Sequence, residues 1–181
     1  VAKYDVNGNP LWARKFGGSS NDIVYGMGVD PLGFVYVTGS QRSSMTVAGT
    51  VFPTNQYGDF YLLKYAPNGN LLFALHAGTT SGESGENIGF DAQGNVYVAG
   101  SMGNALTIGT TTLPQEGVAS AFVAVFSPQG QVISAHNQSG PNAYNAARGI
   151  AVLANGGHYL VGQYDASVVF GTDTLQGIHD C

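Results

Sequence analysis

Short segments of alternating apolar and polar residues, rich in β-branched and aromatic side chains, follow one another along the chain. Between residues 24 and 76 the pattern predicts four strands, at about 24–30, 34–40, 60–65 and 70–76. A turn sequence separates the two members of each pair, DPLG at 30–33 and NGN at 68–70. Period-two alternation on both sides of a glycine-containing turn is the signature of an antiparallel hairpin. This region therefore contains two hairpins.

The same pattern recurs at a fixed period. The pentapeptide VAKYD at 1–5 returns as LLKYA at 62–66 and as VAVFS at 123–127, each time 61 residues later. A second set, YVTGS at 36–40, returns as YVAGS at 97–101 after 61 residues and as YLVGQ at 159–163 after 62. The chain is thus divided into three repeats, at 1–61, 62–122 and 123–181.

Repeats of two hairpins predict an all-β fold, a β-propeller segment of about three four-stranded antiparallel blades in an incomplete ring. A small sheet with two apolar faces is stable only when neighbours cover it, which stacked blades achieve. All 181 residues are assigned to this one segment. Its parts are the second half of a first blade at 1–16, blades at 24–77 and 86–138, and the first half of a last blade at 147–175.

Ring closure is the difficulty that this blade number raises. Propellers close with about four to eight blades, so three cannot form a ring. Two solutions are open: the remaining blades of a longer propeller, or further copies of the chain that complete the ring. In either case an isolated copy exposes unpaired strand edges, which is an aggregation hazard.

Two motifs carry a resemblance to a known family. K-Y-D-x-N-G-N-x-L-W near the start and D-x-x-G-x-V-Y-V-x-G at 30–39 resemble the SBBP-type β-propeller repeats of bacteria. NHL-type propellers are similar around the second motif, although they usually carry Asp where this chain has Gly39, Gly100 and Gly162. The resemblance implies a bacterial protein that is secreted or exposed at the cell surface, with no assigned chemistry.

Composition excludes several classes of protein. Hydrophobic residues make up 44% of the chain and charged residues 9%, which is typical neither of disordered tails nor of long solvated helices. With a net charge of -5, the chain lacks the basic patch that nucleic-acid binding needs. No apolar run approaches the length of a membrane span, so we expect no membrane insertion. The four histidines fall at unrelated repeat positions, and we expect neither a metal nor another cofactor.

One candidate site is formed by the innermost strands of the blades. Tyr25, Glu86 and Arg148 stand at one equivalent position of successive repeats. At one mouth of the central channel they would bind a polar ligand. The alternative is structural, an ion pair between Glu86 and Arg148 of neighbouring blades, worth about 0–1 kcal/mol where it is exposed.

A second candidate lies in the loops before these strands. Asp22 and Glu83 are 61 residues apart, and Asn142 and Asn145 occupy the third copy. Two carboxylates on one face suit glycoside hydrolysis, which requires them about 5–9.5 Å apart. The alternative is that they are loop residues whose side chains accept backbone N–H bonds.

The third candidate region is the set of long connections at 41–58, 102–119 and 163–179, which differ between copies. Recognition is often placed in such loops on a rigid scaffold. The residues selected in them are Arg42 and Tyr57, with Asn55, Gln56, Gln115 and Glu116.

These observations favour a non-catalytic binding or scaffold module, secreted or at the cell surface, that mediates protein or glycan interaction. One alternative is a secreted hydrolase or lyase with carboxylates at the channel mouth. The other is a structural spacer or a component of a surface assembly.

Overall fold

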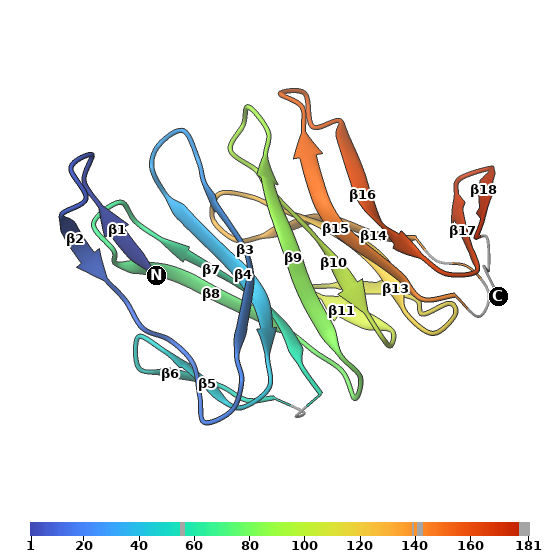
Figure 1. Cartoon of the computed structure of the whole chain (residues 1–181), viewed down its shortest axis with the longest axis horizontal. Coiled ribbons are helices and arrows are strands. Elements are labelled where there is room, and N and C mark those ends of the chain that lie inside the picture. The colour runs from blue at the N-terminus through green and yellow to red at the C-terminus, as the bar shows by residue number, and fades with distance from the viewer. Residues whose placement is uncertain (55–56, 139, 141–142, 178–181) are drawn as a thin grey trace.

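A computed structural model of the chain describes residues 1–54, 57–138, 140 and 143–177. All the elements that it assigns in these residues are β-strands. No helix in the described part is long and apolar enough to cross a membrane. The N-terminal strands lie at one end of the molecule and the C-terminal strands at the opposite end (Figure 1).

Two complete four-stranded antiparallel sheets form the centre. In spatial order the first consists of β3 (Ile23–Val29), β4 (Val35–Gln41), β7 (Asp59–Tyr65) and β8 (Leu71–Ala77). The second consists of β9 (Glu83–Phe90), β10 (Val96–Met102), β13 (Ser120–Phe126) and β14 (Val132–Gln138). These are the two hairpin pairs that the repeats predict, with bounds within about three residues of the expected ones.

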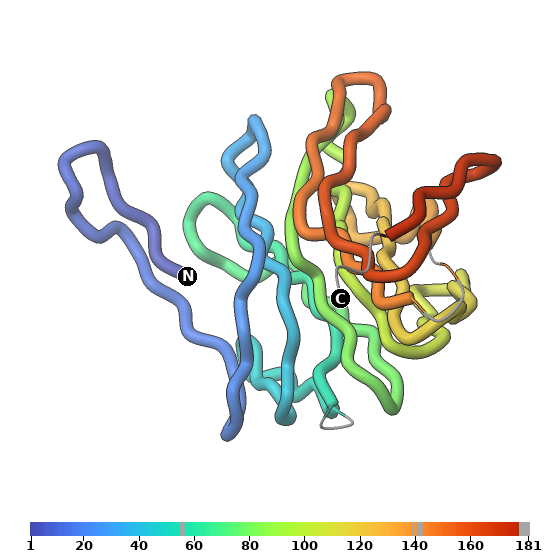
Figure 2. Tube along the Cα trace, turned by 45° about the vertical axis from the view of Figure 1, so that its right-hand side comes forward, coloured from blue at the N-terminus to red at the C-terminus, as the bar shows by residue number. Residues whose placement is uncertain are grey.

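A two-stranded hairpin flanks the complete sheets on each side. The first is formed by β1 (Ala2–Tyr4) and β2 (Pro10–Ala13), and the last by β15 (Asn145–Val152) and β16 (His158–Tyr164). Their sequences correspond by repeat phase to β7–β8 and to β3–β4, respectively. In a view turned by 45° about the vertical axis, the successive hairpins are seen as separate units (Figure 2).

The long connections contain small hairpins that the sequence analysis treated only as variable loops. That interpretation was wrong in each repeat. The hairpins pair β5 (Met45–Val47) with β6 (Thr50–Phe52), β11 (Leu106–Ile108) with β12 (Thr111–Leu113), and β17 (Ser167–Phe170) with β18 (Asp173–Gln176).

Their tight turns explain how such short strands form. Ala48 and Gly49 both have positive φ, as a type I′ turn requires, and Gly109 and Gly171 occupy the first turn position with φ near +60°. In the first two hairpins alternate residues, such as Met45 and Leu106, are fully buried against the larger sheets. In the third hairpin only Val168 is buried. The first two connections are therefore part of the core.

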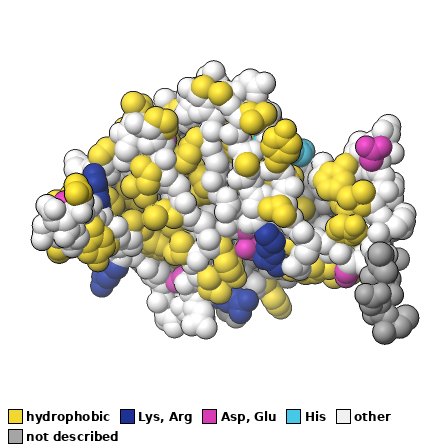
Figure 3. Space-filling model, turned by 45° about the horizontal axis from the view of Figure 1, so that its top comes forward, with side chains coloured by type: hydrophobic (Ala, Val, Ile, Leu, Met, Phe, Trp, Pro, Cys, Tyr) yellow, Lys and Arg dark blue, Asp and Glu magenta, His cyan; other side chains and the backbone are white. Residues whose placement is uncertain are grey.

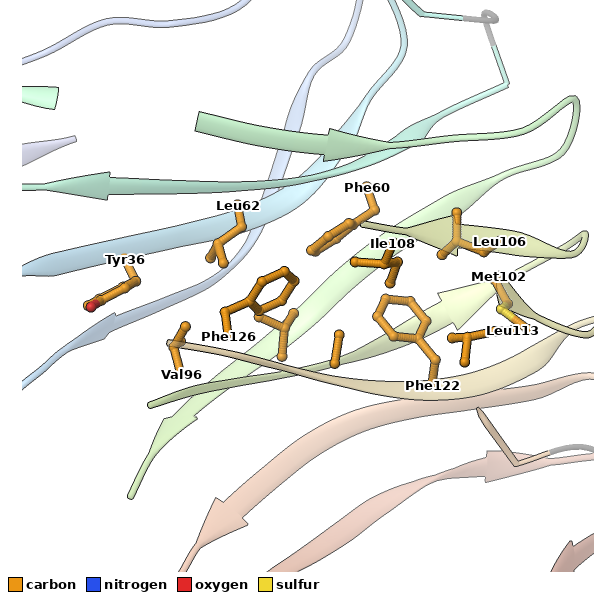
Figure 4. Close-up of a cluster of buried hydrophobic side chains, with 12 residues drawn as sticks. Tyr36, Phe60, Leu62, Val96, Met102, Leu106, Ile108, Leu113, Phe122 and Phe126 are labelled. Carbon is orange, nitrogen blue, oxygen red and sulfur yellow. The ribbon is translucent and has the colours of Figure 1, made fainter. Parts of the chain in front are cut away.

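The largest core lies between the two complete sheets. Phe60 of β7 packs edge-on against Phe122 of β13, with ring centroids 5.7 Å apart, and stacks on Phe126 at 6.4 Å. Residues of the β11–β12 hairpin close the same cluster (Figure 4). Because no helix covers these sheets in the described residues, each sheet is buried mainly by its neighbours.

Candidate functional site

Each inner strand carries one β-bulge at the same place. In β3, β9 and β15 the register with the partner strand shifts so that Tyr25, Glu86 and Arg148, respectively, have no opposite residue. An extra residue of this kind bends the strand and redirects its own side chain. The three residues aligned by repeat phase are therefore the bulged residues of the three inner strands.

The glycine of the second repeated motif makes the bulge possible. Gly39, Gly100 and Gly162 stand on the strand that faces the bulge. A Cβ atom at any of them would overlap a carbonyl oxygen two residues before the bulged position, on Ile23, Ser84 and Ala146, respectively. Glycine recurs there because the partner backbone occupies the space of a side chain.

The bulged side chains line a polar hollow of about 230 Å³. It brings together six of the seven predicted site residues: Tyr25, Arg42, Tyr57, Glu83, Glu86 and Arg148. Sequence reasoning missed five further lining residues, namely Ser40, Gly82, Ser84, Ser101 and Tyr144. Asn55 and Gln56, two of the loop candidates, lie outside the described residues. Charged groups are sparse on the molecule, and Figure 3 shows an acidic and a basic group side by side near the middle of one face.

A polar network connects two sheets at the floor of the hollow. Arg148 Nη1 of β15 lies 3.0 Å from Glu86 Oε1 of β9. The same carboxylate oxygen accepts a 2.6 Å bond from Ser84 Oγ, which lies 3.1 Å from Ser101 Oγ. Glu86 is 9% exposed and Arg148 43%. The ion pair between neighbouring sheets is thus present, and it holds the guanidinium of Arg148 at the surface of the hollow.

Asp22 does not line the hollow but supports it. Its carboxylate accepts the backbone N–H of Arg42 at 3.1 Å, and its other oxygen accepts the N–H of Gly18. This fixes the segment that carries Arg42. No described residue pairs with the Arg42 guanidinium, which is exposed.

Glu83 occupies the place of Asp22 in the next repeat and closes its loop in a similar way. Its side chain, 1% exposed, accepts the Thr79 N–H at 2.8 Å and the Thr79 hydroxyl at 2.6 Å. Asn145 is the equivalent residue of the third repeat and is also buried. The geometry thus agrees with the alternative that Asp22 and Glu83 are loop residues whose side chains accept backbone N–H bonds.

The pKa of Glu83 gives the protein a pH dependence that can be tested. Burial is the largest influence and raises this pKa above its ordinary 4.5, helped by nearby Asp59 and opposed by the bonds from Thr79. Between 4.5 and the raised pKa the unfolded chain holds fewer protons than the folded one, so the free energy of unfolding falls as pH rises. In Glu83→Gln we expect this part of the slope to disappear. Urea unfolding from pH 4 to 7 measures it, and an unchanged slope would contradict the assignment.

Among the described residues, no group of three His, Cys, Asp or Glu side chains is placed to hold a metal ion. The hollow contains two arginines, two glutamates, three tyrosines and serines. Such a set offers hydrogen-bond donors and acceptors and aromatic faces to a polar ligand.

The described residues form repeated antiparallel sheets that bury one another and share a bulge at their inner strands, so the chain is an all-β repeat protein. Residues 11–40 match the family model described as SBBP, a beta-propeller repeat. The match spans β3 and most of β4 and confirms the predicted SBBP-type resemblance.

The chain is also similar to part of a repeat-containing protein of a virus. The chain is 26% identical, over 202 aligned residues, to an uncharacterized WD repeat-containing protein of Acanthamoeba polyphaga mimivirus. The alignment covers 93% of this chain but only 14% of the relative. The chain is therefore similar to a small part of a much longer repeat protein.

Proposed function

We propose that this chain is a non-catalytic β-propeller module that binds a protein or glycan partner at the polar hollow. One observation carries the proposal. Three successive inner strands turn a bulged residue toward the same hollow, where Arg42 and Tyr57 from a connecting segment join them. The stability of a ring does not require three repeats to direct a side chain to the same hollow.

In this proposal the two complete sheets are consecutive blades, and the two flanking hairpins are halves of two more. The chain then supplies about three blades of a ring that needs roughly four to eight. The SBBP match and the alignment to a repeat protein support the arrangement. As with SBBP-type repeats in general, we place the module outside the cell or at its surface.

The chemistry of the hollow favours binding over hydrolysis. Glu86 is held by Arg148 and Ser84, and Glu83 is held by Thr79. A carboxylate pair engaged in this way has little freedom to activate water or to protonate a leaving group. By contrast, Tyr25 and Tyr57 are 45% and 64% exposed, so their ring faces are available to a sugar or a peptide.

Glycan-array binding by the chain tests the proposal. We expect Tyr57→Ala and Arg42→Ala to weaken binding at least tenfold, about 1.4 kcal/mol each, because both side chains reach the ligand from outside the sheets. Leu72→Ala is the control, since Leu72 is 51% exposed but lies on β8, away from the hollow. Equal losses in all three variants would contradict a site at the hollow.

The structural-spacer alternative is supported by the ion pair itself, which joins β9 to β15. Under that alternative no glycan or protein partner binds, and replacing Glu86 and Arg148 changes only assembly. Absence of binding to every glycan and protein partner tested would therefore favour the spacer.

A further inference from the structure

A second hollow adjoins the polar hollow and shares Arg42 with it. Its volume is about 600 Å³, within the usual range for sites that bind small ligands. It lies between the loop before β3 and the connection that follows β4. The residues that line it are Ser19, Ser20, Arg42, Ser43, Ser44 and Thr54. Arg42 therefore stands at the junction of two hollows.

The two segments that form the second hollow are packed directly against each other. Ser43 Oγ accepts the backbone N–H of Ser20 at 3.1 Å. A Cβ atom at Gly18 would overlap Ser43 Oγ and the carbonyl oxygen of Ser44, so the segments meet closely at this glycine. Because these contacts are already present, the second hollow is formed before a ligand binds, which lowers the ordering cost of binding.

The charge of the second hollow is positive. In the part of the chain that the structure describes, Arg42 is the only charged residue in its lining. The nearest carboxylate on the same connection, that of Asp22, does not line it and accepts the backbone N–H groups of Gly18 and Arg42. The chain as a whole has a net charge of -5, so this site is a local exception. An exposed guanidinium beside hydroxyl groups favours an anionic group on the ligand.

The polar hollow also presents its cations rather than its anions. Glu83 and Glu86 are 1% and 9% exposed, whereas Arg148 is 43% exposed and Arg42 is exposed as well. Only Nη1 of Arg148 contacts Glu86 in the described ion pair, which leaves the other guanidinium nitrogen atoms for a ligand. A ligand that enters either hollow therefore meets an arginine before it meets a carboxylate.

The remaining lining residues favour a sugar over a peptide. Apart from Arg42, the second hollow is lined by serine and threonine, whose hydroxyl groups both donate and accept hydrogen bonds, as sugar hydroxyl groups do. Its described lining includes no aliphatic or aromatic side chain, so an apolar side chain of a peptide would find no partner there. In the adjoining polar hollow, Tyr25 and Tyr57 offer ring faces against which a sugar ring packs.

We propose that the two hollows form one extended site for an acidic oligosaccharide, whose carboxylate or sulfate group binds Arg42. One sugar unit then lies against the tyrosines of the polar hollow, and the next lies among the serines of the second hollow. The planar guanidinium suits such an anion because it donates two parallel hydrogen bonds. This inference rests on the proposed function, glycan binding at the polar hollow, and names the class of glycan.

An array of matched glycans tests the charge. Each acidic oligosaccharide is paired with a neutral counterpart, in which the carboxylates are reduced to alcohols or the sulfates are removed, and separate pairs distinguish the two anions. We expect the chain to bind the acidic member about tenfold more tightly. Arg42→Gln should abolish this preference, and Arg42→Lys, which keeps the charge but not the planar fork, should restore part of it.

A filled second hollow tests the extended site. Ser19 is exposed in the loop before β3, and Ser19→Trp places a bulky ring in the second hollow. We expect about tenfold weaker binding of acidic oligosaccharides and unchanged binding of the acidic monosaccharide, which occupies only the polar hollow. Leu72→Trp is the matched control, because Leu72 is 51% exposed on β8 and lines neither hollow.

Three results would overturn the inference: equal binding of the acidic and neutral glycans, an acidic preference that persists in Arg42→Gln, or oligosaccharide binding that is unchanged in Ser19→Trp. Each of these leaves glycan binding by the chain, and with it the proposed function, in place. Binding of a protein partner without any glycan would likewise contradict the inference alone. Absence of all binding would contradict both, so the two failures are distinguishable.

Discussion

Phe60→Ala should lower the free energy of unfolding by about 3–5 kcal/mol, the usual cost of removing a buried aromatic ring. Phe60 is 1% exposed and belongs to β7, but its ring contacts Phe122 and Phe126 of the neighbouring sheet. In repeat proteins stability is approximately the sum of each repeat's own stability and the interfaces between neighbours. The substitution removes part of an interface and leaves a cavity among packed hydrophobic side chains.

Urea unfolding followed by circular dichroism measures this loss. Leu72→Ala on β8 is the control, because Leu72 is 51% exposed and its truncation should cost less than about 0.5 kcal/mol. If Phe60→Ala cost no more than the control, the two sheets would not be coupled through this cluster.

Repeat phase predicted the sheets because every strand is marked more than once. A single YVTGS segment does not show by itself whether it forms a strand. Its return as related sequences at 97–101 and 159–163 identifies both the strand and the turn beside it. The small hairpins were missed because each has strands of only three or four residues and its turn sequence varies, Ala48-Gly49 in one repeat and Gly109-Thr110 in the next. The differences in sequence between the repeats were interpreted as evidence for loops. Buried positions such as that of Met45 do keep a hydrophobic residue in the next repeat, although the residue itself changes.

The candidate site was predictable as far as it follows the repeat. Tyr25, Glu86 and Arg148 differ completely in chemistry, yet their common phase placed them together, and Glu86 and Arg148 do form an ion pair. Tyr144 was not predictable in this way, since the corresponding place in the preceding repeat is Gly82. The bulge was not predicted either, because an extra residue in one strand can be recognised only when the register with its partner strand is known.

Gly100→Ala tests the bulge directly and should cost about 3 kcal/mol, at the upper end for overpacking. A Cβ at this position would overlap the Ser84 carbonyl oxygen and lie 2.9 Å from the ring of Phe122. The carbonyl is main chain, so it can move only if β9 loses its bulge or separates from β10. Losing the bulge would turn Glu86 away from Arg148, and separation would break the hydrogen bonds around it.

Gly157→Ala is the matched control for Gly100→Ala. Gly157 is exposed, its φ is not positive, and an added Cβ would meet only the ends of two side chains, at 3.2 and 3.4 Å. We therefore expect less than about 0.5 kcal/mol there. Thermal unfolding of both variants, together with the glycan binding of Gly100→Ala, separates two effects. If the variant kept both stability and binding, the bulge could not be what positions Glu86, because the substitution cannot be accommodated while the bulge persists.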